Sequence, residues 1–182
     1  DHLALWRAEA ERYDLDPDAD RIEVPLRWQS DNGITITRRY IFERDSYVVR
    51  VVHEVSNPTA TDWRAYQYNQ LRRTTETEGP GFLGAASYTG GVIYSPEEKY
   101  EKISFGNMED EDLSLDITNG WLAMIQHYFL AAWVPEREQN LRYYTRVSRG
   151  EYILGQSSPW QTVAAGQTGV FENRLFVGPK EQ

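Results

Sequence analysis

Apolar and polar residues alternate along most of the chain after residue 20. Between Ile22 and Trp28 every second residue is apolar, which is the period of a half-buried β-strand. Similar runs predict strands at residues 34–42, 47–55, 63–71, 92–94, 113–117, 143–148, 151–156, 160–164 and 170–177. Turn residues such as Asn32-Gly33 separate these runs. Strands that follow one another through short turns predict a mainly β, antiparallel fold with short helical segments.

Three segments depart from this alternation. Residues 1–20 hold seven acidic residues and two arginines, and we expect a separate N-terminal segment there, either a loop or a short helix over residues 4–13, ahead of a domain at 21–182. Ser95, Pro96 and Glu97 have the composition of a helix start. The apolar stretch 121–134 is either one buried helix or two strands broken near Gln126, because periodicity alone does not separate the two.

Composition narrows the classes of function. The 182 residues carry 28 acidic and 19 basic side chains, a formal net charge of −9. Such a chain repels phosphate backbones and anionic lipids, so nucleic acid is not an expected partner. The absence of Cys excludes thiol catalysis, disulfides and Cys-ligated metals. The longest apolar stretch, 121–134, is shorter than the ~20 residues of a membrane-spanning helix.

Both ends of the sequence predict an excised domain. The chain has no initiator Met, and it stops soon after an apolar strand, at Pro179. We therefore expect a domain that is truncated at both ends relative to the full-length protein, with any membrane attachment in segments outside this chain.

The three histidines, His2, His53 and His127, lie in no metal-binding or hydrolytic motif. His53 lies among valines, and we expect a structural role for it. His127 is the better functional candidate, although a structural role is favoured for it too. The acidic run at 109–112 lacks the ligand spacing of a calcium loop, and a solvated loop is expected there. We predict no catalytic residues, no metal and no cofactor.

Glycines and aromatic residues offer two further candidate sites. The glycines at 79–81 and 90–91 match no phosphate-binding pattern and are interpreted as turns. Trp63, Tyr66 and Tyr68 could form a platform that stacks on a sugar, but a place in the core or on the sheet surface is favoured. We expect Trp121 and Trp133 to be structural, because both lie in the most apolar stretch.

Several longer motifs resemble a known family. They read GGVIYSPEEKYEK at 90–102, NGWLAMIQHYF at 119–129, AAWVP at 131–135, AGQTG at 165–169 and LFVGP at 175–179. In order and rough spacing they resemble the large periplasmic domain of the bacterial membrane protein insertase YidC. The resemblance covers residues 20–182, and we find none in the first 20 residues.

The resemblance implies both a fold and a function. The fold would be an antiparallel β-supersandwich similar to galactose mutarotase-like folds, with residues 121–134 forming two strands. The chain would be the periplasmic domain of a bacterial inner-membrane protein, without catalytic activity of its own. The whole protein would insert and fold inner-membrane proteins as a chaperone, alone or with the Sec translocon. Nascent membrane proteins are further candidate partners.

In this family the accessory protein SecF contacts the middle of the domain, which corresponds to residues 63–120. Within that range Tyr94, Lys99, Tyr100 and Lys102 are our candidate partner-binding residues, because Tyr suits interfaces and charges orient a partner. On the residues alone, a solvated loop beside a strand is the favoured interpretation. The alternative function is a carbohydrate-binding or aldose-epimerase-like domain, which would need a paired general acid and base.

Overall fold

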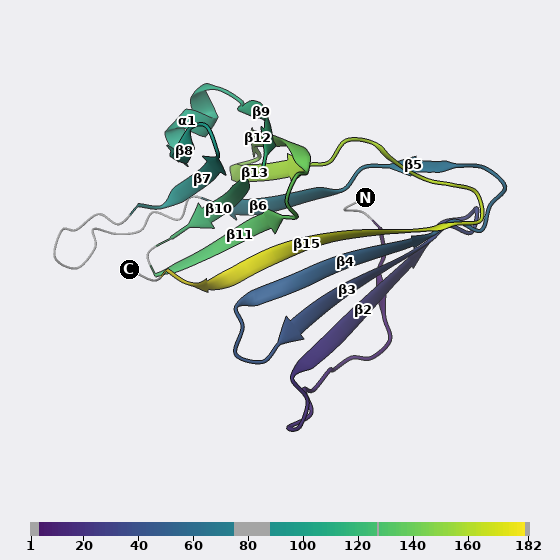
Figure 1. The fold of residues 1–182 in the computed structure, drawn as a ribbon. Helices are drawn as coiled ribbons and strands as arrows, with labels where there is room; N and C mark the ends of the chain where they lie inside the picture. Colours follow the sequence, from purple (N-terminus) through teal and green to yellow (C-terminus); the bar gives the residue numbers. More distant parts are fainter. Residues whose placement is uncertain (1–3, 75–87, 127, 181–182) are drawn as a thin grey trace. The chain divides into compact units, whose positions relative to one another are not determined.

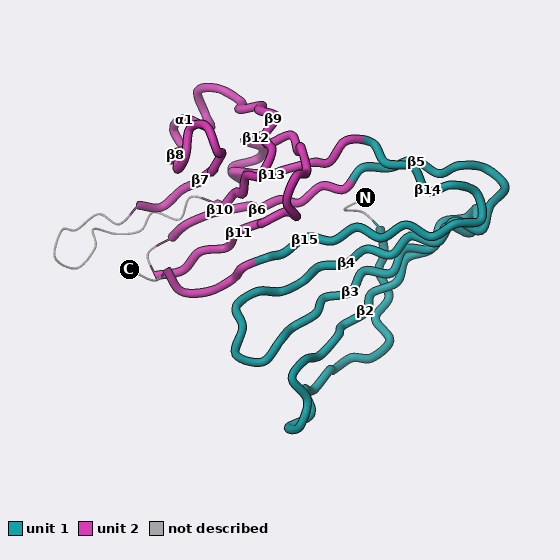
Figure 2. Tube along the Cα trace, in the orientation of Figure 1, with its two compact units in different colours: residues 1–66, 160–175 teal, residues 67–159, 176–182 magenta. Residues whose placement is uncertain are grey.

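The alternating segments form antiparallel strands, which confirms the mainly β prediction (Figure 1). The computed structural model describes residues 4–74, 88–126 and 128–180. It divides into two compact units, shown in Figure 2: residues 1–66 with 160–175 form unit 1, and residues 67–159 with 176–182 form unit 2. No helix in the described residues is long and apolar enough to cross a membrane.

Unit 1 contains one sheet and a small strand pair. Its sheet runs in the order β1-β2-β3-β4-β15, and β5 pairs with β14. The bounds are β1 Arg7–Ala8, β2 Arg21–Gln29, β3 Thr35–Glu43, β4 Val48–Ser56, β5 Trp63–Ala65, β14 Gln161–Val163 and β15 Thr168–Pro179, of which residues 176–179 belong to unit 2. The β2–β3 turn uses Gly33 at a φ of 93°, a conformation that glycine adopts without strain.

Two groups of contacts hold unit 1 together. Ile34, Val55 and Val163 form a buried cluster, against which Trp63 and Phe171 pack. Asn57 is fully buried, and its amide nitrogen donates to the carbonyl oxygens of Thr61, Val163 and Ala164. The amide oxygen accepts from the backbone N–H and the hydroxyl of Thr59. Asn57 thus satisfies carbonyls from two segments that are far apart in sequence.

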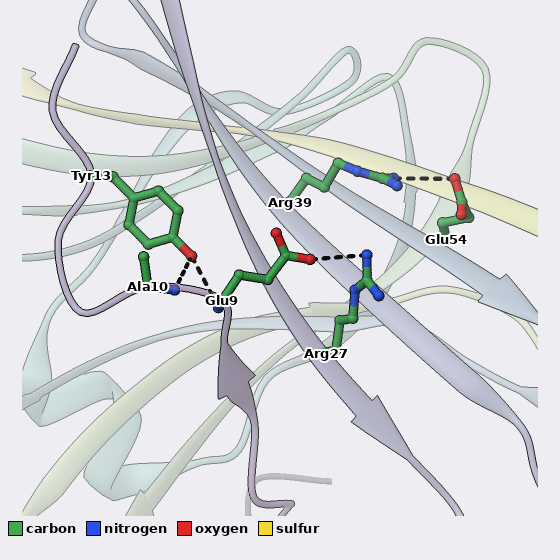
Figure 3. A network of polar contacts seen from close by, with 6 residues as sticks. All are labelled: Glu9, Ala10, Tyr13, Arg27, Arg39 and Glu54. Carbon is green, nitrogen blue, oxygen red and sulfur yellow. Dashed lines mark hydrogen bonds and ion pairs between the residues drawn. The ribbon is translucent and has the colours of Figure 1, made fainter.

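Of the two alternatives for the N-terminal segment, a loop or a short helix over residues 4–13, the helix does not form. β1 pairs instead with β2, with Arg7 opposite Arg27 and Ala8 opposite Leu26. Figure 3 shows that the Tyr13 hydroxyl accepts from the backbone N–H groups of Glu9 and Ala10, each at 3.1 Å, and that the Glu9 carboxylate pairs with Arg27 at 2.9 Å. The boundary at residue 20 stays a prediction.

Unit 2 contains two four-stranded groups and one short helix. One group has the order β11-β10-β7-β8, and the other has the order β6-β13-β12-β9. The bounds are β6 Tyr68–Thr74, β7 Gly90–Ser95, β8 Lys99–Ile103, α1 Phe105–Asp110, β9 Ser114–Thr118, β10 Trp121–Ile125, β11 Phe129–Pro135, β12 Asn140–Ser148 and β13 Glu151–Ser157. Leu122, Ile93, Tyr143 and Leu154 are among its fully or almost fully buried side chains.

The stretch 121–134 forms the β10–β11 hairpin, as the family resemblance implied. Its apolar residues do not alternate with polar ones because both faces of β10 are covered. Leu122 and Ala123 point to opposite faces of the strand, and they are 0% and 1% exposed. A strand that is buried on both faces is a continuous apolar run, which resembles a buried helix in sequence.

Four local predictions in and around unit 2 need correction. Residues 63–71 form two strands, β5 and β6, not one, and the connection at Gln67 donates its N–H to the Ser158 hydroxyl at 3.0 Å. The helix start at Ser95 is instead the turn between β7 and β8. The helix is α1, capped by Ser104, and it contains two of the acidic residues that were expected in a loop.

The glycines at 90–91 are not a turn either, because they begin strand β7 and pair with β10. A Cβ on Gly91 would lie 2.7 Å from the end of the Met108 side chain and 3.2 Å from that of Leu154, so β7 packs closely on α1 and β13 at this point. The glycines at 79–81 lie outside the described residues.

Candidate functional site

The β7–β8 hairpin brings the four candidate partner-binding residues together. Tyr94 lies on β7, opposite Tyr100 on β8, while Lys99 pairs with Ser95 and Lys102 pairs with Val92. Strand β8 is the last strand in its sheet order. Lys99, Tyr100 and Lys102 are exposed, and Tyr94 is half-buried.

The hairpin turn fixes the start of β8. The Ser95 hydroxyl accepts from the backbone N–H of Glu98 at 3.0 Å, and the Lys99 ammonium donates to the carbonyl oxygen of Pro96 at 2.6 Å. Lys99 has a φ of 61°, in the left-handed region, which costs a non-glycine residue roughly 1 kcal/mol. The Lys99 ammonium is thus bonded to the turn at the first residue of β8, whereas Lys102 lies further along the strand.

Three aromatic rings form a row across neighbouring strands. Tyr94 on β7 is paired on one side with Trp121 of β10 and on the other side with Tyr100 of β8. Paired residues share a face of an antiparallel sheet. The Tyr94 and Trp121 rings stack with centroids 5.7 Å apart at 3°, and Tyr100 lies 6.3 Å from Trp121 at 59°. At the end of the row, Tyr100 is 49% exposed.

Trp121 connects this row to the interior of unit 2. It packs against a buried cluster of Val92, Ala123, Ile125 and Ala132. The expected structural role is therefore only part of what Trp121 does, because its other contacts are with the two tyrosines of the surface row. This second role could not be predicted from the sequence, because it depends on the register that pairs three strands.

A second ring–cation contact lies beside the row. The Lys102 ammonium is 4.9 Å from the centroid of the Tyr88 ring, within the range of a cation–π interaction. The Tyr88 hydroxyl donates to the carbonyl oxygen of Gly91 at 2.6 Å. Burial raises the pKa of Tyr88 to about 12 and also raises the pKa of Tyr100. Both rings are neutral near pH 7, and they carry hydroxyl groups at their tips.

Among the described residues, His53 has structural contacts. His53 on β4 accepts a hydrogen bond at its Nε2 from the Arg38 Nε at 2.8 Å, and the Arg38 guanidinium lies 4.1 Å from the Trp6 ring centroid. Burial, and then the Arg38 charge, lower the pKa of His53 to about 4. The ring is therefore neutral near pH 7, and this nitrogen is occupied. His2 and His127 lie outside the described residues.

Acidic and aromatic candidates are also dispersed. In the described part of the chain, no group of three or more His, Asp or Glu side chains could hold a metal ion. The Tyr152 hydroxyl donates to the Glu109 carboxylate on α1. Trp63 packs against the core cluster of unit 1, and Tyr66 stacks edge-on against Trp160 at 5.0 Å. Tyr68 belongs to unit 2, so neither unit holds all three rings.

Comparisons with known proteins agree on one family. The model of the YidC periplasmic domain matches residues 1–182, including the first 20 residues, where the motifs had shown no resemblance. A membrane protein insertase YidC from Alkalilimnicola ehrlichii is 53% identical over 184 residues, which cover 100% of this chain and 33% of the relative. Another, from Methylococcus capsulatus, is 40% identical and covers 100% of this chain and 34% of the relative.

The chain thus spans about a third of the length of these relatives. Among solved structures, a galactose mutarotase related enzyme from Lactobacillus acidophilus has a TM-score of 0.61 at 8% identity, over 97% of this chain and 73% of that protein. This likeness confirms the expected galactose mutarotase-like fold. Identity this low shows the fold alone, since one fold hosts many functions.

Proposed function

The chain belongs to the family of YidC periplasmic domains, and we propose that it is a non-catalytic interaction domain of a membrane protein insertase. The observation that carries this proposal is the match over residues 1–182, together with 53% identity to a relative named as that insertase. The whole protein would insert and fold bacterial inner-membrane proteins, and this domain would lie on its periplasmic side.

The absence of a catalytic role is part of the proposal. Sugar epimerisation needs an acid and a base whose protons can move near neutral pH. The Nε2 atom of His53 is engaged by Arg38, and the pKa of the ring is lowered to about 4. These contacts support a structural His53. The carbohydrate alternative rests on fold likeness alone and is not favoured.

Polarimetry tests this part of the proposal. With α-glucose or α-galactose, the chain should leave the mutarotation rate at its spontaneous value. Clear acceleration that His127→Ala abolishes would contradict a non-catalytic domain.

The partner in this proposal is SecF, and through it the Sec translocon, with nascent membrane proteins as further contacts. The surface would comprise Tyr94, Tyr100 and Lys102, with Lys99 at its border. The exposed end of the ring row supports this choice, because a tyrosine offers a large contact area with a polar tip. Lys102 would orient the partner more than it would add affinity.

A pull-down of SecF with the full-length insertase tests this surface. The variant is the double charge reversal Lys99→Glu and Lys102→Glu. The matched control is Arg146→Glu with Arg149→Glu, two exposed cations of β12 and its turn. We expect SecF recovery to fall several-fold with the first pair and to hold with the second. Unchanged recovery, with a normal circular dichroism spectrum, would place the contact elsewhere.

A further inference from the structure

Strand β8 leaves one edge of its sheet open. It ends the order β11-β10-β7-β8, and within the described residues no strand pairs with its outer edge. Its residues Lys99, Tyr100, Glu101 and Lys102 are all exposed. An open edge presents unpaired backbone groups that can accept a further strand.

The second group of strands in unit 2 ends differently. Its last strand, β9, carries Asp116, which pairs with Arg142 of β12 through two contacts of 3.1 and 3.2 Å. On β8, Glu101 lies opposite Ile93 and has no ion pair in the described part of the chain. The charge of β9 is therefore matched inside its sheet, whereas the charge of Glu101 on β8 is not.

The register shows what an added strand would meet. Tyr100 ends the aromatic row that begins at Trp121. The next row on the same face runs from Ala123 on β10 through Val92 on β7 to Lys102 on β8. Glu101 lies between them in sequence and points to the other face. Each of the three residues would face a different side chain on an added strand.

We propose that an extended segment of the partner adds as a strand to the outer edge of β8. It would place an aromatic or β-branched residue opposite Tyr100, a basic residue opposite Glu101 and an acidic residue opposite Lys102. The inference rests on the proposed function, in which this hairpin contacts SecF, and adds the mode of binding. Backbone hydrogen bonds supply affinity in such additions, and alternate side chains supply register.

A second copy of the chain fits the edge less well. Two β8 strands that pair antiparallel over their whole length, about a two-fold axis, place Glu101 opposite Glu101. Like charges directly opposite are unfavourable. A register centred on Tyr100 relieves this repulsion, but it overlaps only three residues because β8 begins at Lys99.

Synthetic peptides with a fluorescent label test the added strand against the 182-residue chain. The antiparallel probe reads Thr-Thr-Glu-Lys-Ile-Thr-Thr, with Glu to face Lys102 and Ile to face Tyr100. The parallel probe has the reversed order. Fluorescence anisotropy measures binding, and a charge-swapped peptide, with Lys and Glu exchanged, is the control.

We expect one of the two matched probes, antiparallel or parallel, to bind at least about two- to fivefold more tightly than the charge-swapped peptide. That is the range for one cross-strand pair, and the swap alters two. Lys102→Glu should abolish that preference, because each peptide then has one opposite-charge pair and one like-charge pair, whereas Arg146→Glu should not change it. Only every second amide of an added strand points toward the edge of β8. N-methylation of those amides should weaken binding, and N-methylation of the amides between them should not. Binding that ignores N-methylation, or a preference that Lys102→Glu leaves unchanged, would overturn strand addition, as would a chain that dimerises through β8.

The two proposals fail in different ways. Loss of SecF recovery on charge reversal, together with no peptide preference, would overturn strand addition and keep the SecF contact. A clear peptide preference with unchanged SecF recovery would overturn the SecF contact and keep the strand-accepting edge.

Discussion

Units 1 and 2 both carry charged residues and rings on their strands, yet these groups have different partners. In unit 1 the Arg38 guanidinium lies against Trp6 and donates to His53. Arg50 forms two hydrogen bonds with Glu172, of 2.7 and 2.9 Å. In unit 2, on β8, the Glu101 carboxylate has no ion pair in the described residues, and the Tyr100 ring is half exposed.

The difference separates groups that stabilise the domain from groups that are available to a partner. A bidentate Arg–carboxylate pair that spans 122 positions of sequence fixes two strands of unit 1. An exposed ring and an unmatched carboxylate contribute little to folding. Removal of groups of the first kind should therefore lower stability, and removal of groups of the second kind should lower only binding.

The largest expected effect lies in the interior of unit 2. Trp133 is 9% exposed, and its indole N–H donates to the carbonyl oxygen of Gln70 at 3.4 Å. Trp133→Ala should reduce the free energy of unfolding by about 3–5 kcal/mol. Tyr100→Ala, at the exposed end of the ring row, should reduce it by less than about 1 kcal/mol. Urea denaturation checks both values, and equal losses would erase the distinction between interior and surface rings.

The next effect concerns the interior hydrogen bonds of unit 1. Asn57→Ala removes three donated bonds, one of them to the buried Val163 carbonyl, at a cost of about 2–3 kcal/mol. Thr59→Ala removes one hydroxyl that donates to Asn57 at 2.7 Å, and it should cost about 1 kcal/mol. Thermal unfolding of both variants tests the ranking, which would be wrong if Thr59→Ala were the more damaging change.

A third test measures how the stability of the domain depends on pH through His53, which lies in unit 1. His53 takes up a proton near pH 6.5 in the unfolded chain but only near pH 4 in the folded domain. Between these values the unfolded state binds more protons, so stability falls as pH falls from about 7 to 4 and levels off below. The expected loss is on the order of 3 kcal/mol.

His53→Gln is the matched control for this titration, since its amide oxygen can accept from Arg38 and does not titrate. Other acids, such as Glu172, titrate in both proteins, so the difference between the two stability curves isolates His53. Curves that stay parallel from pH 7 to pH 4 would show that His53 is not held neutral.

The smallest expected effect concerns two exposed cations of unit 2, Lys102 on β8 and Arg142 on β12. Lys102→Glu should change the free energy of unfolding by no more than about 0.5 kcal/mol, because the side chain is exposed. Arg142→Glu should destabilise more, since it places two carboxylates where Arg142 now pairs with Asp116. Denaturation at low and high salt checks this order. The difference in stability between the two variants should become smaller at high salt, because salt screens the repulsion between exposed charges.

Much of the fold could be predicted from local pattern. The alternation around Ile22–Trp28 predicted β2 because one face of that strand is more buried than the other. The helix start predicted at Ser95 and Pro96 was wrong, because residue types that begin a helix are also common in turns. Helix α1 was missed because it has only six residues, and its capping box uses Asn107 in place of the usual Glu or Gln.

The candidate surface could be predicted only in part. Tyr94, Lys99, Tyr100 and Lys102 were proposed from their types and from a family resemblance, and the hairpin does bring them together. Trp121 was not proposed as part of this surface, because its contact with both tyrosines depends on the pairing of β10 with β7. The His53–Arg38 bond was missed for the same reason, since it joins residues fifteen positions apart on neighbouring strands.

Site-specific photocrosslinking tests the central claim, that the β7–β8 hairpin is the partner surface, most directly. A photoreactive phenylalanine analogue would replace Tyr100 or Leu115 in the full-length insertase, in membranes that contain the Sec translocon. The two positions are similarly exposed, at 49% and 44%, and lie on the edge strands β8 and β9. We predict a crosslink to SecF from position 100 and none from position 115. Equal crosslinking from both positions, or none from position 100, would contradict the assignment of this surface.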